Sequence, residues 1–230
     1  MDYLSEAIKQ SLWLIIHFDH ELATIVWTSL RVSLTSTALA SIVGVPLGFI
    51  IAVGRFKGKH HVEVALNTSM ALPTVVVGLT VYSFISRRGP LGAYGLLFTP
   101  TAMVIGQFIL ATPIIVALSV SATKAIDARV GETARTLGAN AVQTAAAILN
   151  EARYAILVAI VAGFGRVIAE VGSAMILGGN IAGYTRTMTT AIALETGKGE
   201  FSLAIALGII LLLIALSVNA VVQSFRLRGS

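Results

Sequence analysis

Long apolar runs separated by short polar segments dominate this sequence. A helix of about 20 residues, rising 1.5 Å per residue, crosses a hydrocarbon core of roughly 30 Å. The pattern predicts five membrane-spanning helices, at 27–53, 65–85, 101–123, 154–177 and 201–225. Five spans place the two ends of this chain on opposite sides of the membrane.

The N-terminal residues show a shorter, periodic pattern. Their apolar positions recur on one helix face: Leu4, Ile8, Leu12, Ile15 and Ile16. The apolar run at 12–16 is too short to span, and the first residues lack the positive charge of a cleaved leader. We expect segment 1–25 to form an amphipathic helix along the outer membrane face, with Trp13 at headgroup depth.

Composition agrees with a membrane protein. Of the 230 residues, 56% are hydrophobic and 12% are charged, and the mean hydropathy is +0.88. Soluble domains average about 45–50% apolar and about 25% charged residues. The expected fold is therefore an all-α integral membrane protein. The absence of Cys excludes a disulfide framework and thiol chemistry.

The Lys and Arg residues indicate the topology, because cytoplasmic loops collect them. The predicted spans put nine on one side: Arg55, Lys57, Lys59, Lys124, Arg129, Arg135, Arg153, Arg226 and Arg228. The other side holds five: Lys9, Arg87, Arg88, Arg186 and Lys198. We therefore expect the N-terminus outside and the C-terminal tail 226–230 in the cytoplasm. The charges are scattered over short loops, so they do not indicate nucleic-acid binding.

Proline and glycine positions within the spans suggest bends and close packing. Pro46, Pro73 and Pro113 each remove a backbone donor and bend a helix, as a packing kink or to shape a pathway. Gly44 and Gly48 form a small-xxx-small pair that lets a second helix approach closely. The segment 26–225 forms one transmembrane domain in this interpretation, without a soluble second domain.

Motifs for enzymatic chemistry are absent from the sequence. Gly197-Lys198 lacks the first Gly of a phosphate-binding loop, because position 192 is Ile. Neither His-Glu-x-x-His nor Gly-x-Ser-x-Gly occurs. We expect no catalytic residue, metal or cofactor in this chain. Four side chains of metal-binding type are interpreted as a polar link before the first span: His17, Asp19, His20 and Glu21.

The long loop 124–153, on the predicted cytoplasmic side, carries an amphipathic pattern. Gly138 interrupts it where a turn between two short helices can form. Glu132 and Arg135 give a polar side, and such a surface helix suits a groove in a partner protein. Small and apolar residues define the opposite side at helical spacing: Val130, Ala134, Leu137 and Ala141. The loop is therefore a candidate coupling element.

This loop also resembles a known motif. Glu132, Thr133 and Ala134, then Gly138 after three residues and Ile148 after nine more, resemble the "EAA" loop of ABC importer permeases. The pattern departs from that motif at Thr133 and at the two residues 150–151. The resemblance implies a type I ABC importer transmembrane domain with about five transmembrane helices and a cytoplasmic coupling helix that enters a cleft of a separate ATPase subunit.

A second stretch narrows the resemblance to the oxyanion permeases. Residues 165–172 are similar to the Arg-x-x-x-Glu-x-Gly stretch of the molybdate, tungstate and sulfate permeases. The runs 172–180 and 184–190 look most like the tungstate type, whose chains are also short. The resemblance implies ATP-driven import of an oxyanion, tungstate first and molybdate or sulfate as alternatives.

Arg166 and Glu170 are also conspicuous on physical grounds. Ionised groups inside a span cost at least about 2.5–3.5 kcal/mol, so they normally face the interior and pair. Four residues apart on one helix, these two can pair with each other. One interpretation is a structural ion pair; the other is a gate in which Arg166 attracts the anion and Glu170 weakens its binding. Further candidate path residues donate hydrogen bonds: Ser173, Thr74 and Gln107.

The resemblance also implies partners. It predicts a homodimer in the lipid of the cell inner membrane, two ATPase copies that bind ATP and Mg, and a periplasmic oxyanion-binding protein. One alternative is a secondary transporter driven by an ion gradient, with Arg166 and Glu170 as its charge relay. A membrane scaffold without transport is a further alternative, and an intramembrane enzyme is disfavoured because no nucleophile and base pair is visible.

Overall fold

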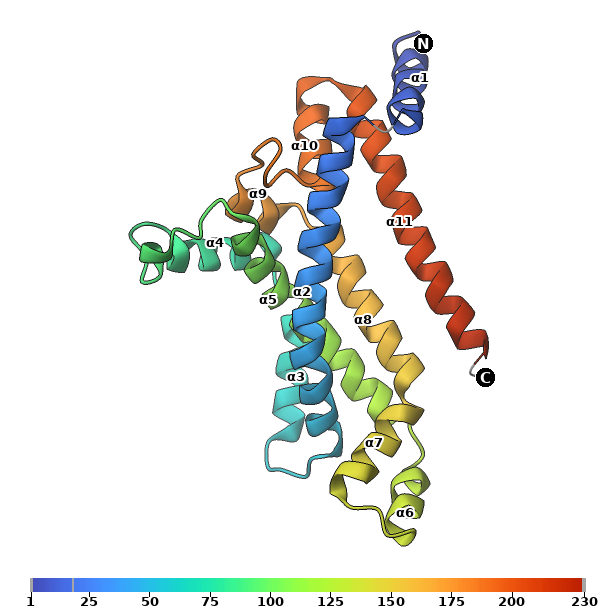
Figure 1. Cartoon of the computed structure of the whole chain (residues 1–230). Helices are drawn as coiled ribbons and strands as arrows, with labels where there is room; N and C mark the ends of the chain where they lie inside the picture. Colours follow the sequence, from blue (N-terminus) through green and yellow to red (C-terminus); the bar gives the residue numbers. More distant parts are fainter. Residues whose placement is uncertain (1, 18, 229–230) are drawn as a thin grey trace.

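The computed structural model describes residues 2–17 and 19–228, and every element in them is helical. Figure 1 shows long helices side by side, short helices at both ends, and an arm, residues 74–99, that projects from the bundle. Met1, Phe18, Gly229 and Ser230 lie outside the described residues, and with them small parts of the predicted segments 1–25 and 226–230. The helices are α1 (Asp2–Ile16), α2 (His20–Val53), α3 (Lys59–Ser69), α4 (Thr74–Ile85), η1 (Gly92–Tyr94), α5 (Pro100–Lys124), α6 (Ala128–Thr136), α7 (Ala141–Glu151), α8 (Arg153–Ile168), α9 (Gly172–Gly178), α10 (Met188–Lys198) and α11 (Phe201–Arg228).

Three helices are long and apolar enough to cross a membrane unbroken, and they confirm three predicted spans. They are α2, α5 and α11. Asp19 caps the start of α2, where its carboxylate accepts the Glu21 N–H. Thr99 caps α5, and Pro100 occupies the first turn, where its missing N–H costs nothing. At 34 residues, α2 is about 51 Å long, which exceeds the hydrocarbon core.

The predicted span 65–85 is not one straight helix. It is divided between α3 and α4, whose axes meet at 96°. Pro73 cannot donate a backbone hydrogen bond and disfavours helical geometry at the residue before it. The carbonyl of Pro73 then accepts the N–H of Val77 and starts α4. The proline therefore separates two helices, where the sequence alone suggested a bend within one.

The predicted span 154–177 is also interrupted. The helix α8 ends at Ile168 and α9 begins at Gly172, so the prediction of one continuous helix is wrong. A second bend, of 69°, joins α7 to α8. If each bent pair, α3 with α4 and α7 with α8, crosses the membrane once, the structure holds five spans.

Glycines set the distance between the central helices. A Cβ atom at Gly48 of α2 would lie 2.6 Å from the Ser119 Cβ and 2.8 Å from the Val116 carbonyl oxygen of α5. Gly44 lies similarly close to Ile115. Residues with side chains would push α2 and α5 apart, so the predicted close approach at this glycine pair is confirmed.

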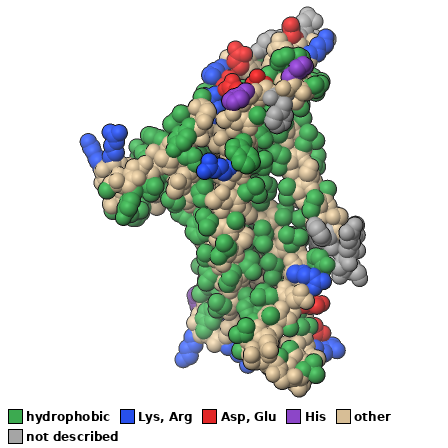
Figure 2. Space-filling view, viewed as in Figure 1, with side chains coloured by type: hydrophobic (Ala, Val, Ile, Leu, Met, Phe, Trp, Pro, Cys, Tyr) green, Lys and Arg blue, Asp and Glu red, His purple; other side chains and the backbone are tan. Residues whose placement is uncertain are grey.

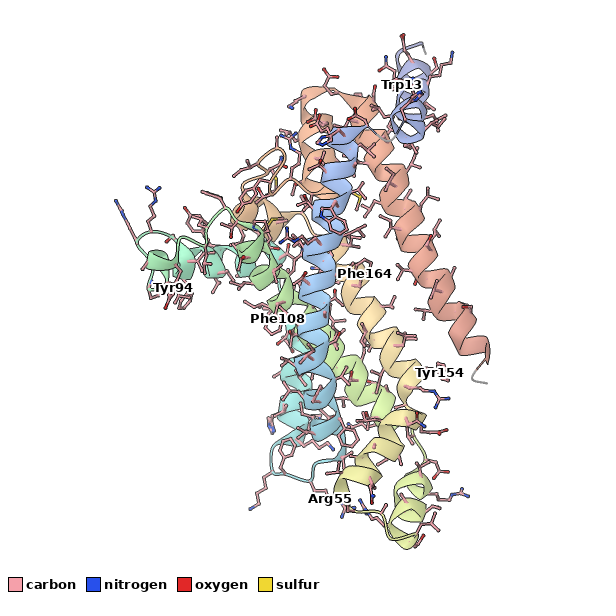
Figure 3. The ribbon with its side chains drawn as sticks, viewed as in Figure 1. Trp13, Arg55, Tyr94, Phe108, Tyr154 and Phe164 are labelled. Atoms are coloured by element: carbon pink, nitrogen blue, oxygen red, sulfur yellow. The ribbon has the colours of Figure 1, made fainter. Side chains whose placement is uncertain are left out.

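Charged side chains gather at the two ends of the molecule. Figure 2 shows most of them at the top and the bottom, with further Lys and Arg side chains at the tip of the arm and a few on the largely hydrophobic face between. In Figure 3, Trp13 of α1 lies at one end, and Arg55, which follows α2, lies at the other. The helix α1 is joined to α11 by a hydrogen bond from the Ser202 hydroxyl to the Gln10 side-chain oxygen, 2.8 Å long. The N-terminal segment is helical, as predicted, and Trp13 on it is exposed.

Candidate functional site

The elbow, defined here as α6, α7 and the turn between them, is built by local sequence signals. Asp127 caps α6. Asn140 and Gln143 cap α7 reciprocally, each side chain accepting the other's backbone N–H at 2.9 Å. Between the helices, Gly138 has φ +87°, a conformation that L-residues with a side chain rarely adopt. The predicted turn at Gly138 is confirmed.

The inner side of the elbow is a small packed contact. Ile148 of α7 reaches Gly131 of α6, where an added Cβ would lie 3.4 Å from the Ile148 Cδ1. Thr144 is buried between the helices, and its hydroxyl donates to the Asn140 carbonyl at 2.9 Å. Ile148, a predicted coupling residue, therefore holds α6 against α7.

The outer side of the elbow exposes large apolar side chains. Leu137 is 83% exposed and Val142 is 78% exposed, one on each side of Gly138. Glu132 and Thr133 are exposed as well, and Ala134 is half-buried. The predicted stripe from Val130 through Ala141 is not one helix face, because α6 ends at Thr136. Val142 was not predicted from the sequence, although its position shortly after the turn at Gly138 was a usable signal.

The break, defined here as residues 169–171 between α8 and α9, is organised by Glu170. The Arg166 Nη1 donates to the Glu170 Oε2 at 3.0 Å, so the predicted pair forms. Glu170 is not on a helix, however, because α8 ends two residues earlier. Its second oxygen accepts the Ser173 N–H at 3.1 Å and thereby satisfies the first turn of α9. Glu170 is buried, while the Arg166 side chain is 36% exposed.

A threonine in the first turn of the distant helix α10 also holds the break. The Thr189 hydroxyl donates to the Glu170 carbonyl oxygen at 2.7 Å, and both residues are buried. Thr187, at the start of α10, forms a capping box with Thr190. The contact was not predictable from the sequence, because nothing local indicates which carbonyl a buried threonine hydroxyl will reach.

The start of α4 packs against the break. A Cβ at Gly172 would lie 3.1 Å from the Thr74 Oγ1 and 3.5 Å from the Glu170 Oε1. A Cβ at Gly78 of α4 would lie 3.0 Å from the Ser173 Cα. The structure therefore brings four of the five predicted path residues together: Arg166, Glu170, Ser173 and Thr74. The Ser173 hydroxyl is buried without a hydrogen-bond partner among the described residues.

Gln107, the fifth predicted path residue, has a different contact. Its side-chain oxygen accepts a hydrogen bond from Ser36 at 3.0 Å, and both residues are buried between α2 and α5. This contact joins two helices. Gln107 is thus separate from the group that surrounds Glu170.

Comparison with known proteins decides the family. The family described as "Binding-protein-dependent transport system inner membrane component" matches residues 44–228, most of the chain. This chain belongs to that family. It is a multi-pass membrane permease, a transport component.

Individual relatives of this permease cover almost its whole length. A tungstate uptake system permease protein from Peptoclostridium acidaminophilum is 40% identical over 98% of this chain and 99% of its own. Its counterpart from Campylobacter jejuni is 41% identical over 98% and 95%. Relatives named as molybdenum transport permeases are less similar, at 29–30% identity.

The fold of the permease is also that of solved transporters. A structure titled as an inward-facing conformation of the MetNI methionine ABC transporter superposes with a TM-score of 0.74 at 17% identity, over 91% of this chain and 96% of that one. The fold class is therefore the type I ABC importer transmembrane domain, as the resemblance implied.

The polar link before α2 has structural partners in the permease. Asp19 caps α2, and Glu21 pairs with Arg186 at 3.1 Å, which ties α2 to the loop before α10. The His17 ring stacks on Trp13 with centroids 4.3 Å apart. Across the residues that the structure describes, no group of three or more His, Cys, Asp or Glu side chains could hold a metal ion.

Proposed function

We propose that this chain is the membrane subunit of an ATP-driven importer that carries an oxyanion, tungstate in the first place, across the cell inner membrane. Its family membership supports the transport role, and the tungstate permeases that it resembles along their whole length support the substrate. Molybdate and sulfate are the alternative substrates. The chain itself has no catalytic role; ATP and Mg bind to a separate ATPase subunit.

The proposed assembly contains two copies of this chain, two ATPase copies and a periplasmic binding protein. The spans themselves support a second copy within the membrane. In the most apolar stretch of α11 only 17% of the residues are buried, and in that of α2 only 28%. Helix faces of this kind need lipid or another protein against them. A single chain therefore leaves apolar surface for a second copy and for the bilayer.

The proposed orientation places the N-terminus outside and the C-terminus in the cytoplasm. The loop between α2 and α3, which carries Arg55 and Lys57, and the elbow lie at the same end of the molecule, opposite α1 (Figure 1). Positively charged loops favour the cytoplasmic side. This orientation presents the elbow to a cytoplasmic ATPase and presents α1, α10 and the arm to the periplasm.

The main structural support for this proposal is the exposed apolar tip of the elbow, formed by Leu137 and Val142. Leu137 and Val142 are 83% and 78% exposed, and α6 and α7 lie at the end of the molecule opposite α1 (Figure 1). Two large apolar side chains on a rigid, capped turn form a ready anchor for a hydrophobic cleft. We infer that ATP binding draws two elbows together and tilts the spans from inward-facing to outward-facing, and that hydrolysis reverses the change.

The Glu170 break is the proposed gate of the path. The Arg166 guanidinium is partly exposed, so it can attract a dianion, while Glu170 neutralises part of its charge. Partial neutralisation keeps the anion from being held too tightly to leave. Ser173 has a hydroxyl without a partner among the described residues, and Thr74 lies beside Gly172. These two hydroxyls are the nearest candidates to donate hydrogen bonds to a passing oxyanion.

The test is ATP hydrolysis by this chain reconstituted with its ATPase. The binding protein is added empty, or loaded with tungstate, molybdate or sulfate. Stimulation by the tungstate-loaded form above the other forms is the expected result. Equal hydrolysis with every form, together with uptake that collapses when a protonophore is added at high ATP, would replace the proposal with a transporter driven by an ion gradient.

A further inference from the structure

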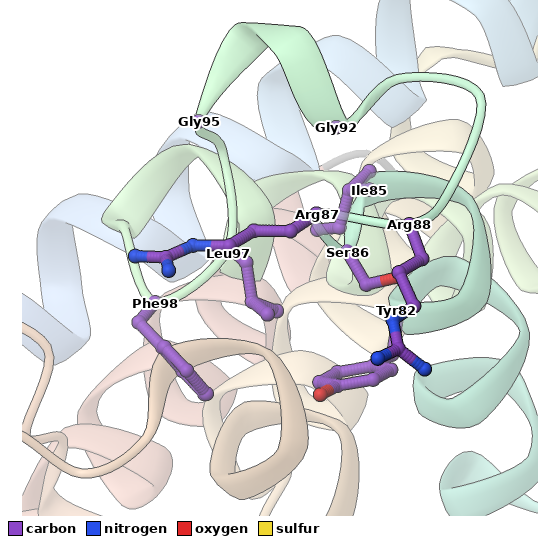
Figure 4. A pocket seen from close by; sticks show the side chains of 9 residues that line it. All are labelled: Tyr82, Ile85, Ser86, Arg87, Arg88, Gly92, Gly95, Leu97 and Phe98. Carbon is purple, nitrogen blue, oxygen red and sulfur yellow. The ribbon is translucent and has the colours of Figure 1, made fainter.

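The projecting arm ends in a hollow that no step of the proposed transport uses. The hollow has a volume of about 610 Å³ and lies between the end of α4, η1 and the residues before α5. Figure 4 shows the Arg87 side chain extending toward Leu97 and Phe98, and the Arg88 head group beside the Tyr82 ring. The two guanidinium groups thus flank the hollow on different sides, and both side chains are exposed.

These two positive charges form no ion pair with any carboxylate that the structure describes. The segment 64–126 contains no Asp or Glu. Among the described residues, no carboxylate lies within ion-pair distance of Arg87 or Arg88. The C-terminal end of α4 offsets only about half an elementary charge. The site therefore keeps a net positive charge of more than one unit.

The backbone around the hollow is held in place by hydrogen bonds and close contacts. Three short hydrogen bonds fold the chain back after α4: Gly89 N–H to Ser86, Leu91 N–H to Phe84 and Gly92 N–H to Gly89. A Cβ at Gly89 would clash with the Ser83 carbonyl oxygen, so this fold needs glycine. Phe98 has φ +61°, and its N–H donates to the Leu177 carbonyl at 2.9 Å. The hollow is therefore preformed, which lowers the entropy cost of binding.

The lining has the chemistry of an anion site. Guanidinium groups present paired donors that match the oxygens of a tetrahedral oxyanion, and hydroxyls add further donors. Tyr82 and Ser86 supply those hydroxyls, and no lining residue is acidic. We propose that the Arg87–Arg88 hollow binds a tetrahedral oxyanion at the outer end of the arm.

The position of the hollow adds a second station to the proposed path. The helix α4, with 12 residues, is about 18 Å long. Its first residue, Thr74, lies at the Glu170 break, and its other end leads into the hollow. The two positive charges would raise the local concentration of oxyanion on the side of the gate where the arm lies. Dissolved salt screens such charges, so this attraction should weaken as the salt concentration rises. The identity of the anion rests on the proposed function; the site itself rests on its own geometry.

Tungstate binding to the permease–ATPase complex tests this proposal, with the binding protein and ATP left out. Equilibrium dialysis in phosphatidylcholine nanodiscs should show salt-sensitive binding that R87A/R88A weakens about tenfold. R87K/R88K should be intermediate, because Lys keeps the charge and loses the paired donors. The control R55A/K57A removes two charges at the opposite end and should bind like the unaltered chain.

Each further outcome has a defined meaning. If phosphatidylglycerol displaces tungstate from the unaltered complex and has no such effect on R87A/R88A, the proposal holds, with a lipid phosphate as the oxyanion. If R87A/R88A binds tungstate normally, the proposal is overturned; loss of stimulation by the loaded binding protein would then assign the arginines to an acidic protein surface. If tungstate binds at the hollow as expected but no loaded binding protein stimulates ATP hydrolysis, the proposed function is overturned and the anion site at the hollow still stands.

Discussion

The elbow and the Glu170 break are both interruptions of helix, yet they are built in opposite ways. In the elbow, Asn140 and Gln143 satisfy backbone groups three residues away, and the apolar side chains face outward. In the break, Glu170 is buried and receives hydrogen bonds from Arg166, Ser173 and the distant Thr189. The elbow is closed by neighbours in sequence alone, whereas the break also needs the distant Thr189 of α10.

This difference indicates that the elbow serves to bind a partner, whereas the break serves to stabilise the fold. Exposed apolar residues on a locally stable turn contribute little to the stability of the chain, so they are free to serve a partner. The buried Glu170 carboxylate accepts hydrogen bonds from Arg166 of α8 and Ser173 of α9, so its loss weakens the junction of these two helices. Substitutions in the elbow should therefore affect coupling, and those in the break should affect folding.

Glu170→Ala should give the largest effect. It leaves Arg166 without its partner and the first turn of α9 without its acceptor. Breaking a buried ion pair costs about 3–5 kcal/mol, and the partial exposure of Arg166 favours the lower end. Thermal unfolding of the solubilised chain should show the loss. Glu170→Gln keeps an acceptor for Ser173 and should lose less; an unchanged melting temperature for both variants would contradict the framework role.

Gly138→Asp should abolish ATP-driven uptake while the chain still folds. The carboxylate would enter the proposed ATPase cleft unpaired, a change that typically costs about 2–5 kcal/mol of binding. Gly138→Asn is the matched control, because Asn also tolerates positive φ and adds no charge. Uptake and the amount of folded complex are the measurements. Normal uptake by the Asp variant would remove the coupling role from the elbow.

A pair of Gly→Ala substitutions compares the regions directly. At Gly78 the new Cβ would lie 3.0 Å from the Ser173 Cα, so Gly78→Ala should destabilise the chain by about 1–3 kcal/mol through overpacking. At Gly138 nothing lies within 4 Å, and only the positive φ opposes a side chain. Gly138→Ala should cost about 1–2 kcal/mol. Denaturation of both variants, side by side, should rank Gly78 first; the reverse order would contradict the packing of α4 on α9.

Leu137→Ala should have the smallest effect on stability, within about 0.5 kcal/mol, because the side chain is 83% exposed. Affinity for the ATPase should nevertheless fall by about tenfold, which corresponds to about 1.4 kcal/mol. Leu213→Ala is a control at an exposed apolar position on α11. Equal ATPase affinity for both variants would show that the elbow tip makes no contact with the partner.

Much of the fold was predictable because membrane spans are long and their signal is strong. The three unbroken spans, the glycine contact between α2 and α5 and the turn at Gly138 all follow from local residue patterns. The two broken spans did not, since an apolar run looks the same whether or not it bends. Pro73 indicated a bend without its angle, and nothing before Gly172 marked the end of α8.

The sequence by itself determined that this chain is a helical membrane permease, which residues form the elbow and that Arg166 and Glu170 pair, because hydropathy, capping and glycine conformation act over a few residues. Only the tertiary structure decided that Glu170 lies outside a helix and binds Ser173 and Thr189, that Gln107 bonds to Ser36, and that Arg87 and Arg88 flank a hollow without acidic partners. The Glu170–Thr189 and Gln107–Ser36 contacts join residues far apart in the chain, and their geometry is set by how helices pack, which no local pattern encodes.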